Sequence, residues 1–192
     1  SPALAPTSNT TYIANFTTTP CAPIPSGLMA WWRGDNNAKD ETGVNNGTLI
    51  GNMTFGAGKV GGGFLGNSTN NPGLVQVPDS PSLALNRSLT LEGWLRVDSY
   101  GGAVIERRTS DFRWSYQLSI LSTGELDFTI WNNNNSGTSA NSDPLPLGQF
   151  VHFAASLDEN TSQAKMYING SQVRQFTITQ PRNVISDAII NI

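Results

Sequence analysis

Apolar residues alternate with polar ones in many short stretches of this 192-residue chain. In residues 88–97, Leu89, Leu91 and Leu95 share one face of an extended chain, and Trp94 lies on the opposite face. A period of two is typical of a β-strand that buries one face. No window of a dozen residues spaces its apolar positions as a helix does, so little helix is expected.

Residues that favour turns separate these stretches. The chain contains 19 glycines and 11 prolines, and Gly51-Asn52 is one of several turn signals that lie between two predicted strands. Further strands are predicted at residues 28–32, 48–50, 53–55, 73–77, 103–105, 116–120, 126–131, 150–157, 164–168, 173–178 and 188–192. About a dozen short strands joined by such turns predict an all-β fold, a two-sheet antiparallel jelly-roll sandwich.

The composition excludes several classes of function. Lys and Arg number 11 against 14 Asp and Glu, only 13% of residues are charged, and no basic cluster exists. These values argue against a nucleic-acid partner. No apolar run approaches the roughly 20 residues of a membrane span. The single cysteine, Cys21, allows no intrachain disulfide and no Cys-ligated zinc site.

The chain divides into two parts. Residues 1–25 form an extended segment rich in Pro and Thr, and residues 26–192 form the predicted jelly-roll domain. The middle of the first part is strand-prone, with Tyr12, Ile13 and Phe16 among polar neighbours. Low charge, abundant Asn, Thr and Gly, and a start without Met predict a secreted or cell-surface protein whose signal peptide has been removed.

Several blocks of the domain resemble a known family. Residues 26–40, 45–49, 55–61, 77–83, 89–95, 146–154 and 166–170 are similar, in this order, to bacterial laminin-G-like domains of the concanavalin A-like lectin and glucanase type. The resemblance covers about residues 26–192 and implies the jelly-roll fold. It implies less about function, because this fold hosts lectins, adhesion modules, glycosidases and spacers.

Two departures from the family's pattern stand out. The acidic stretch that commonly follows the Lys-Val-Gly block is replaced by residues 64–74, which contain no carboxylate. This weakens any calcium or saccharide site that depends on that stretch. Relatives also continue past the position of Ile192 into a final strand, so the resemblance implies a sheet that lacks its last strand.

The residues give little support for an enzyme. Glycoside hydrolysis needs two carboxylates that flank the cleaved bond, and the nearest pair, Glu125 and Asp127, stands alone on its strand. No Gly-x-Ser-x-Gly motif accompanies the single histidine, His152, which is interpreted as a structural strand residue. A glycoside hydrolase therefore ranks below a binding module.

Carbohydrate recognition uses aromatic rings that stack on sugars, together with amide hydrogen bonds. Trp131 followed by Asn132 and Asn133 is the first candidate for such a site, and Trp94 is the second. The alternative interpretation is that the tryptophans pack in the core and that the Asn run is only a loop.

No cofactor is certain, but calcium is a candidate. Asp35 and Asp40 offer carboxylate oxygens at close spacing in a turn. The alternative is that Asp and Asn are simply favoured turn residues.

A second hypothesis follows from the strand that the sheet lacks. An open sheet edge is normally covered or paired, and the segment around Tyr12, Ile13 and Phe16 could fill it in its own chain or in a neighbouring copy. The alternative is that the sequence ends at a fragment boundary, with the remaining strand in sequence beyond it.

The sequence thus predicts an extracellular, non-catalytic recognition or adhesion module for carbohydrate or a cell-surface protein. The alternative function is a structural subunit that joins copies of itself into a filament by strand donation.

Overall fold

Strands and turns make up the part of the chain that the computed structural model describes, residues 26–66, 72–84, 88–178, 185 and 187–192, and these residues contain no helix. Accordingly, no helix in these ranges has the length and apolarity that a membrane crossing requires. The strands are β1 (Thr48–Ile50), β2 (Thr54–Ala57), β3 (Gly62–Leu65), β4 (Leu74–Val77), β5 (Leu89–Arg96), β6 (Gly102–Arg108), β7 (Trp114–Ile120), β8 (Glu125–Trp131), β9 (Gly137–Pro144), β10 (Phe150–Asp158), β11 (Gln163–Ile168), β12 (Ser171–Thr177) and β13 (Ile189–Asn191).

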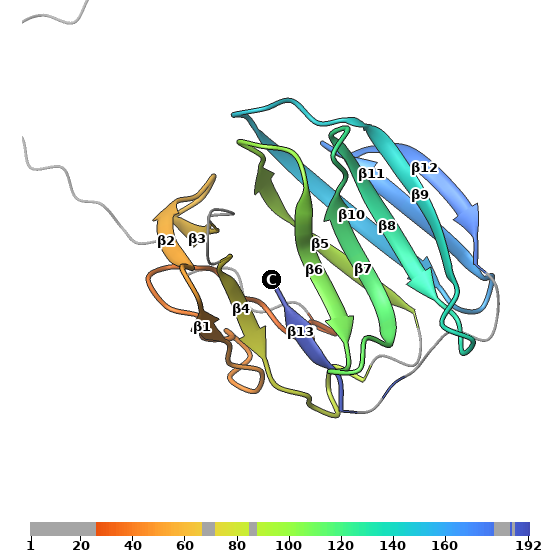
Figure 1. Cartoon of the computed structure of the whole chain (residues 1–192), viewed down its shortest axis with the longest axis horizontal. Helices are drawn as coiled ribbons and strands as arrows, with labels where there is room; N and C mark the ends of the chain where they lie inside the picture. The colour runs from red at the N-terminus through yellow and green to blue at the C-terminus, as the bar shows by residue number, and fades with distance from the viewer. Residues whose placement is uncertain (1–25, 67–71, 85–87, 179–184, 186) are drawn as a thin grey trace, which may run out of the picture.

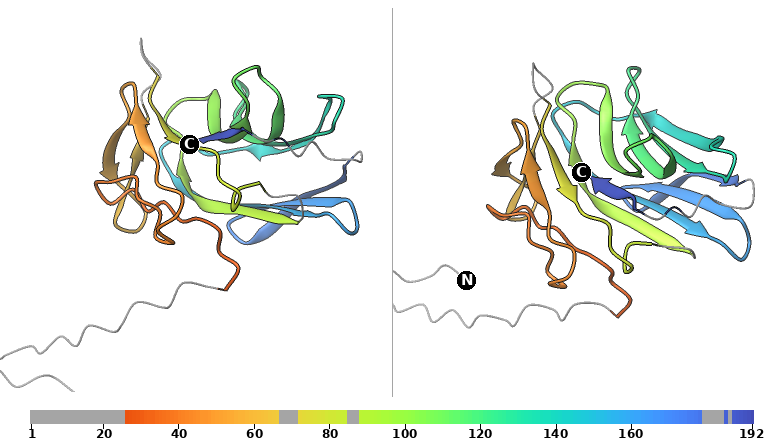
Figure 2. Two further views of the ribbon diagram at one scale, coloured as in Figure 1. Left: turned by 90° about the horizontal axis from the view of Figure 1, so that it is seen from below. Right: turned by 60° about the horizontal axis from the view of Figure 1, so that its bottom comes forward.

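The strands form two stacked sheets (Figure 1). The larger sheet has the order β1-β4-β13-β6-β7-β8-β9, and the smaller has the order β12-β11-β10-β5. A separate hairpin contains β2 and β3. Strands within each sheet pair antiparallel, and Figure 2 shows the two sheets face to face. The predicted two-sheet antiparallel jelly-roll sandwich is confirmed.

The core lies between the two sheets, as the period-two pattern predicts. Leu118 and Phe128 of the larger sheet and Ala155 and Met166 of the smaller sheet are completely buried there. Burial of an apolar side chain of the size of Leu or Phe contributes about 1.5–3 kcal/mol. Residues between these positions point to the outer faces, so the alternation decides which side chains are available to a ligand.

Three segments differ from the sequence prediction. Residues 28–32 were predicted as a strand, but they make only an isolated bridge between Trp32 and Asp40. Strands β3 and β9 were not predicted. Strand β9 is an edge strand of polar residues that pairs with β8 alone, and β3 begins with two glycines. Neither therefore shows the apolar alternation on which the prediction relied.

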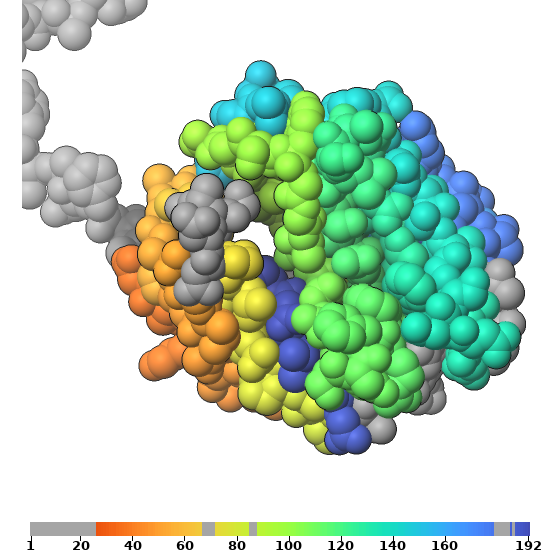
Figure 3. Space-filling view, viewed as in Figure 1, coloured from red at the N-terminus to blue at the C-terminus, as the bar shows by residue number. Residues whose placement is uncertain are grey.

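Of the strand edges that have no partner in the described part of the chain, two bear on the predicted missing strand. Strand β5 is the last strand of the smaller sheet. Strand β13 pairs with only Glu106–Arg108 of β6, and Figure 3 shows an opening above it, between β4 and the upper part of β6. The segment with Tyr12, Ile13 and Phe16 lies outside the described residues, so its predicted strand stays a prediction.

Candidate functional site

The candidate site lies where two hairpins of the larger sheet end side by side. Residues 109–113 connect β6 to β7, and residues 132–136 connect β8 to β9. Both turns lie at the same end of the sheet, the lower end in Figure 1. Asn135 joins them, because its Oδ1 accepts a hydrogen bond from the Trp114 main chain at 3.4 Å and its Nδ2 donates to the Phe112 carbonyl at 3.5 Å.

Three aromatic rings form a continuous row across these turns. The Trp131 and Trp114 rings are stacked, with centroids 5.2 Å apart and planes 24° apart. The Phe112 ring lies 5.8 Å from Trp114, and the Arg108 guanidinium lies 4.9 Å from the Phe112 centroid. We call Phe112, Trp114 and Trp131 the aromatic row. Each such contact stabilises the arrangement by about 0.5–1.5 kcal/mol.

Trp131 lies on the outer face of the larger sheet, as the alternation of side chains along β8 predicts. Its neighbours Leu126, Phe128 and Ile130 are buried in the core, so the odd positions of β8 face outward. On its paired strand, a Cβ at Gly137 would lie 3.5 Å from the indole ring. Trp114 thus packs on one side of Trp131 and Gly137 on another, which leaves less ring surface for a sugar than the sequence suggested.

Sequence analysis missed two rings of the row, Trp114 and Phe112, and Phe112 is its exposed end. Its side chain is 58% exposed, and its φ of 61° lies in the left-handed region. The turn is fixed by hydrogen bonds from the Thr109 main chain to the Arg113 carbonyl and from Phe112 to Thr109. A bulky residue in this conformation is strained by about 1–3 kcal/mol. The only feature of the sequence that could have indicated Phe112 is an aromatic residue in an otherwise polar loop between two strands.

Asp111 and Arg113 form an exposed ion pair within this turn. A hydrogen bond from the Thr109 hydroxyl lowers the pKa of Asp111 below its usual value, and the Arg113 guanidinium adds to the effect. Arg113 Nε lies 3.1 Å from Asp111 Oδ2. The carboxylate therefore stays ionised next to the row and favours the turn that exposes Phe112.

The asparagine run has two different roles. Oδ1 of Asn132 accepts hydrogen bonds from the main chains of Asn134 and Ser136, at 3.0 and 3.1 Å, and so builds the turn. Asn133 is exposed, and no hydrogen bond of its side chain is present in the described residues. Of the two predicted amides, Asn133 is the one available to a ligand.

Trp94, the second predicted ring, lies on the outer face of the smaller sheet. Its side chain is 47% exposed. The His152 ring meets it edge-on at 5.3 Å, and Lys59 Nζ lies 5.4 Å from its centroid. The structure thus does not bring Trp94 together with Trp131, which faces outward from the other sheet, and the two are separate candidates.

The carboxylates on the outer face of the larger sheet are occupied by neighbouring side chains. Glu106 accepts hydrogen bonds from Arg108 at 2.6 Å, Asn191 at 2.9 Å and Gln117 at 3.3 Å. On β8, Asp127 accepts one from Thr129 at 2.6 Å. These groups form a polar face beside the aromatic row.

Asp35 and Asp40, the calcium candidates, have separate partners. Both oxygens of Asp40 accept hydrogen bonds, from the main chains of Trp31, Thr42 and Asn45 and from the Thr42 hydroxyl. Asp35 accepts one from Gly62 at 2.6 Å and pairs with Arg33. The described residues contain no group of three or more His, Cys, Asp or Glu side chains that could hold a metal ion. Calcium at these positions stays a prediction.

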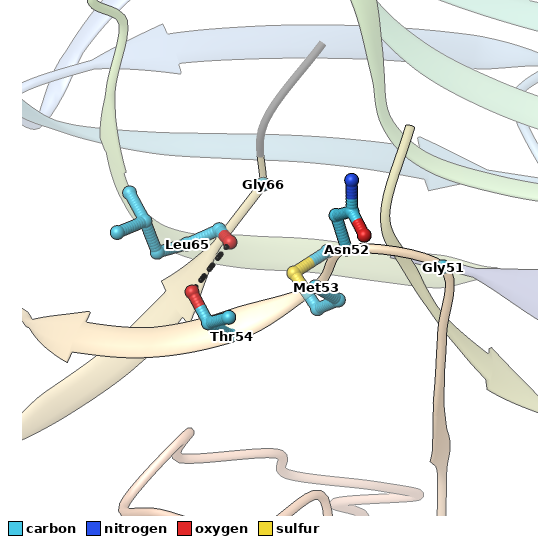
Figure 4. A pocket seen from close by; sticks show the side chains of 6 residues that line it. All are labelled: Gly51, Asn52, Met53, Thr54, Leu65 and Gly66. Atoms are coloured by element: carbon cyan, nitrogen blue, oxygen red, sulfur yellow. Dashed lines mark hydrogen bonds between the residues drawn. The ribbon is translucent and has the colours of Figure 1, made fainter. Parts of the chain in front are cut away.

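A small pocket lies between the β1–β2 turn and the end of β3 (Figure 4). Its lining includes Met53, Thr54 and Leu65, and the Thr54 hydroxyl bonds to the Leu65 carbonyl at 3.4 Å. No titratable side chain lines it, so it is a weaker candidate than the aromatic row.

Comparisons with known proteins agree with this fold. Residues 69–192 match a family model described as "Concanavalin A-like lectin/glucanases superfamily". No curated protein sequence matches the chain. The family match covers well over half of the sequence, and it includes both turns of the candidate site.

Several solved structures share this fold. Domain 4 of AbnA, an extracellular GH43 arabinanase from Geobacillus stearothermophilus solved with arabinotriose, has a TM-score of 0.62 and 21% identity over 86% of this chain and 82% of that one. The binding domain of botulinum neurotoxin DC, solved with SialylT, has a TM-score of 0.61 and 19% identity over 79% of this chain and 39% of that one. The binding domain of Paraclostridial Mosquitocidal Protein 1 has a TM-score of 0.62 and 17% identity, over 79% and 40%. The chain spans about two fifths of these toxin chains.

Proposed function

Because the chain belongs to the concanavalin A-like lectin/glucanase superfamily, we propose that it is an extracellular, non-catalytic module that recognises carbohydrate. Such a module would serve adhesion or attachment to a glycan-bearing surface. The arabinanase domain solved with arabinotriose and the toxin domain solved with SialylT support this ligand class, since both share the fold. Cell-surface protein is the second ligand class, supported by the binding domain of the same toxin solved with rat synaptotagmin II.

The observation that carries the proposal is the aromatic row with its exposed end at Phe112. An exposed ring held in a strained backbone conformation is retained at a cost to stability, as is common at binding sites. Sugars stack their C–H faces on such rings and bond their hydroxyls to amides. The Phe112 ring and the Asn133 amide supply these two contacts from adjacent turns.

Glycan-array binding tests the proposal, with arabinan oligosaccharides and sialylated glycans included. Phe112→Gly removes the ring and at the same time suits the positive φ, so the fold should survive with its stability changed by only about 1 kcal/mol. We expect Phe112→Gly and Trp131→Ala each to weaken glycan binding by about tenfold or more, a loss of about 1.4 kcal/mol.

Trp94→Ala is the matched control, because it removes an exposed tryptophan from the opposite sheet. We expect its glycan profile to equal that of the wild type. If Trp94→Ala abolishes binding while Phe112→Gly does not, the site lies on the smaller sheet instead. A wild-type protein that binds no glycan on the array contradicts the proposed function.

A structural subunit joined by strand donation from the N-terminal segment is the second candidate function. One observation favours it: in the described part of the chain, β5 ends its sheet next to a groove of about 860 Å³. Carbohydrate recognition and strand donation use different surfaces, so neither excludes the other.

A further inference from the structure

Charged side chains lie on the outer face of the larger sheet beside the aromatic row. On β6, Arg108 is paired with Trp114 of the row and bonds to Glu106, so both charges lie on this face. On β8, Asp127 shares the face with Trp131, because the two are four residues apart in one strand. These charges therefore act on any ligand that the row binds.

Arg108 is the cation that contacts the exposed ring of the row, and it already has an anionic partner. Its guanidinium lies 4.9 Å from the Phe112 centroid, and its Nε donates to Glu106 Oε1 at 2.6 Å. Glu106 is only 9% exposed, so loss of Arg108 would leave a buried carboxylate without its counter-charge. A carboxylate on a sugar would compete with Glu106 for the guanidinium, whereas a sugar hydroxyl would not.

Arg113, the cation in the turn after β6, is paired as well. Its Nε lies 3.1 Å from Asp111 Oδ2. The pKa of Asp111 lies below its usual value, chiefly because the Thr109 hydroxyl donates to the carboxylate. Asp111 therefore stays charged at neutral pH, next in sequence to Phe112. Neither guanidinium brings an unbalanced positive charge to the exposed ring.

Asp127 adds a negative charge that no cation balances in the described part of the chain. The Thr129 hydroxyl donates to its Oδ2 at 2.6 Å. Because Thr129 lies between Asp127 and Trp131 along β8, this bond directs the carboxylate toward the row. Asp127 is 8% exposed, and a charge with little water around it acts over a longer distance than one in bulk solvent.

The charges around the row are negative in total. Between Glu106 and Trp131, the charged side chains outside the core are two cations and four carboxylates, namely Arg108 and Arg113 against Glu106, Asp111, Glu125 and Asp127. A surface with an excess of one sign attracts ligands of the opposite sign and repels those of its own. The charge pattern thus separates ligands that present the same rings and hydroxyls.

We propose that the aromatic row selects neutral glycans over sugars that carry a carboxylate, and that Asp127 and the Glu106–Arg108 pair determine this specificity. The inference rests on the proposed carbohydrate recognition and adds the chemical class of the ligand. A neutral sugar stacks on Phe112 and bonds to the Asn133 amide. A sialic or uronic acid makes the same contacts but also meets like charge, and such repulsion is a common source of specificity.

Matched pairs of glycans test the inference by isothermal titration. Galactotriose is compared with trigalacturonic acid, and galactose-terminated glycans are compared with their sialylated forms. At low salt, we expect the wild type to bind the neutral member of a pair at least about threefold more tightly, as one poorly screened like charge at about 10 Å would give. In ~0.5 M sodium chloride the ratio should approach one, because the Debye length falls to about 4 Å.

Two variants identify the residues responsible. Asp127→Asn removes the unbalanced charge and keeps an oxygen that can accept from Thr129, so the ratio of neutral to carboxylated affinity should fall by at least about twofold. Glu106→Gln removes the counter-charge of Arg108 and should lower the ratio by about tenfold, because the guanidinium can then pair with the sugar carboxylate. Asp98→Asn is the matched control, since it removes an exposed carboxylate that follows β5 of the other sheet, and it should leave the ratio unchanged.

The ratio is independent of the fraction of folded protein, so a destabilised variant still answers the question. A wild type that binds the carboxylated member as tightly as the neutral one at low salt, or more tightly, overturns the inference and leaves carbohydrate recognition intact. A ratio that is the same in the wild type, Asp127→Asn and Glu106→Gln also overturns it. A protein that binds neither member of any pair contradicts carbohydrate recognition itself.

Discussion

At the scale of single residues, Asp40 shows how one carboxylate determines the shape of a turn. It is only 4% exposed, and its two oxygens collect hydrogen bonds from Trp31, Thr42 and Asn45. Burial raises the pKa of Asp40, but the hydrogen bonds outweigh this effect and the pKa lies below its usual value. The same contacts fix the orientation of the Trp31 main chain, which donates to Asp40 and accepts from the Glu41 main chain.

We therefore expect Asp40→Asn to lower the free energy of unfolding at pH 7 by about 1–3 kcal/mol, because an amide N–H₂ would face backbone donors. A carboxylate with a lowered folded-state pKa contributes stability above its unfolded-state pKa of about 4, and the contribution is lost as pH falls through the folded-state value. The difference between wild type and variant should thus shrink below pH 4. Urea denaturation at pH 7 and at low pH measures it.

Asp98→Asn is the control for this prediction, because Asp98 is exposed and its ion pair with Arg96 is exposed as well. Its stability should stay within about 0.5 kcal/mol of the wild type. An Asp40→Asn protein as stable as this control at neutral pH would show that the turn does not depend on the carboxylate.

At the scale of strands, Arg107 anchors β13 between β4 and β6. Its side chain is 1% exposed. The guanidinium donates to the Ile185 carbonyl at 2.9 Å and to Asp79 Oδ1 at 2.8 Å, and the other oxygen of Asp79 accepts from the Asp187 main chain. One buried cation thus joins the segment after β4 to the segment before β13.

A double-mutant cycle tests this anchor. Asp79→Ala leaves a buried positive charge without its partner and should cost about 2–4 kcal/mol, whereas Arg107→Met replaces the cation with an apolar side chain and should cost less. The double variant should then lose at least about 1 kcal/mol less than the sum of the two. The exposed Arg96–Asp98 pair, with Nε and Oδ1 2.9 Å apart, is the control and should couple by less than about 0.5 kcal/mol. Additive losses at Arg107 and Asp79 would contradict the anchoring role.

The sequence predicted those strands that bury one face in the core, because their apolar residues alternate. It did not predict strands that are held only by hydrogen bonds to a neighbouring strand. Residues 88–97 and 150–157 alternate cleanly and became β5 and β10. Strand β9 has no apolar alternation and is held by its pairing with β8. Residues 28–32 show the reverse case, because a strand-like pattern does not form a strand without a partner edge.

The candidate site was only partly predictable for a related reason. The residue type and position of Trp131 placed it on the outer face, but nothing local showed that Trp114 would stack on it. The contribution of Phe112 depends on a positive φ that only the folded turn reveals. Trp94 and Trp131 are both outward-facing tryptophans, but they lie on different sheets. The alternation along a strand predicts which face a side chain lies on, and it does not predict which sheet the strand joins.

At the scale of the whole molecule, the aromatic row and the β5 edge, which the proposed strand donation would use, lie on different surfaces of one sandwich. The row lies on the outer face of the larger sheet, and β5 is the last strand of the smaller sheet. Assembly by strand donation would present many copies of the row together. Linked sites bind a multivalent surface about 10²–10⁴ times more tightly than one site does, with no new contact.

This coupling gives a prediction that neither surface gives alone. Tyr12→Asp with Phe16→Asp should leave the affinity for a soluble, monovalent oligosaccharide unchanged, because the aromatic row is intact. Retention on a surface densely coated with the same glycan should fall about 100-fold, because single copies bind through one site. Isothermal titration measures the first quantity and surface plasmon resonance the second. Phe112→Gly should lower both, since it removes the ring and not the assembly. Equal retention of the wild type and of the variant with both aspartates would mean that copies do not act together on the surface.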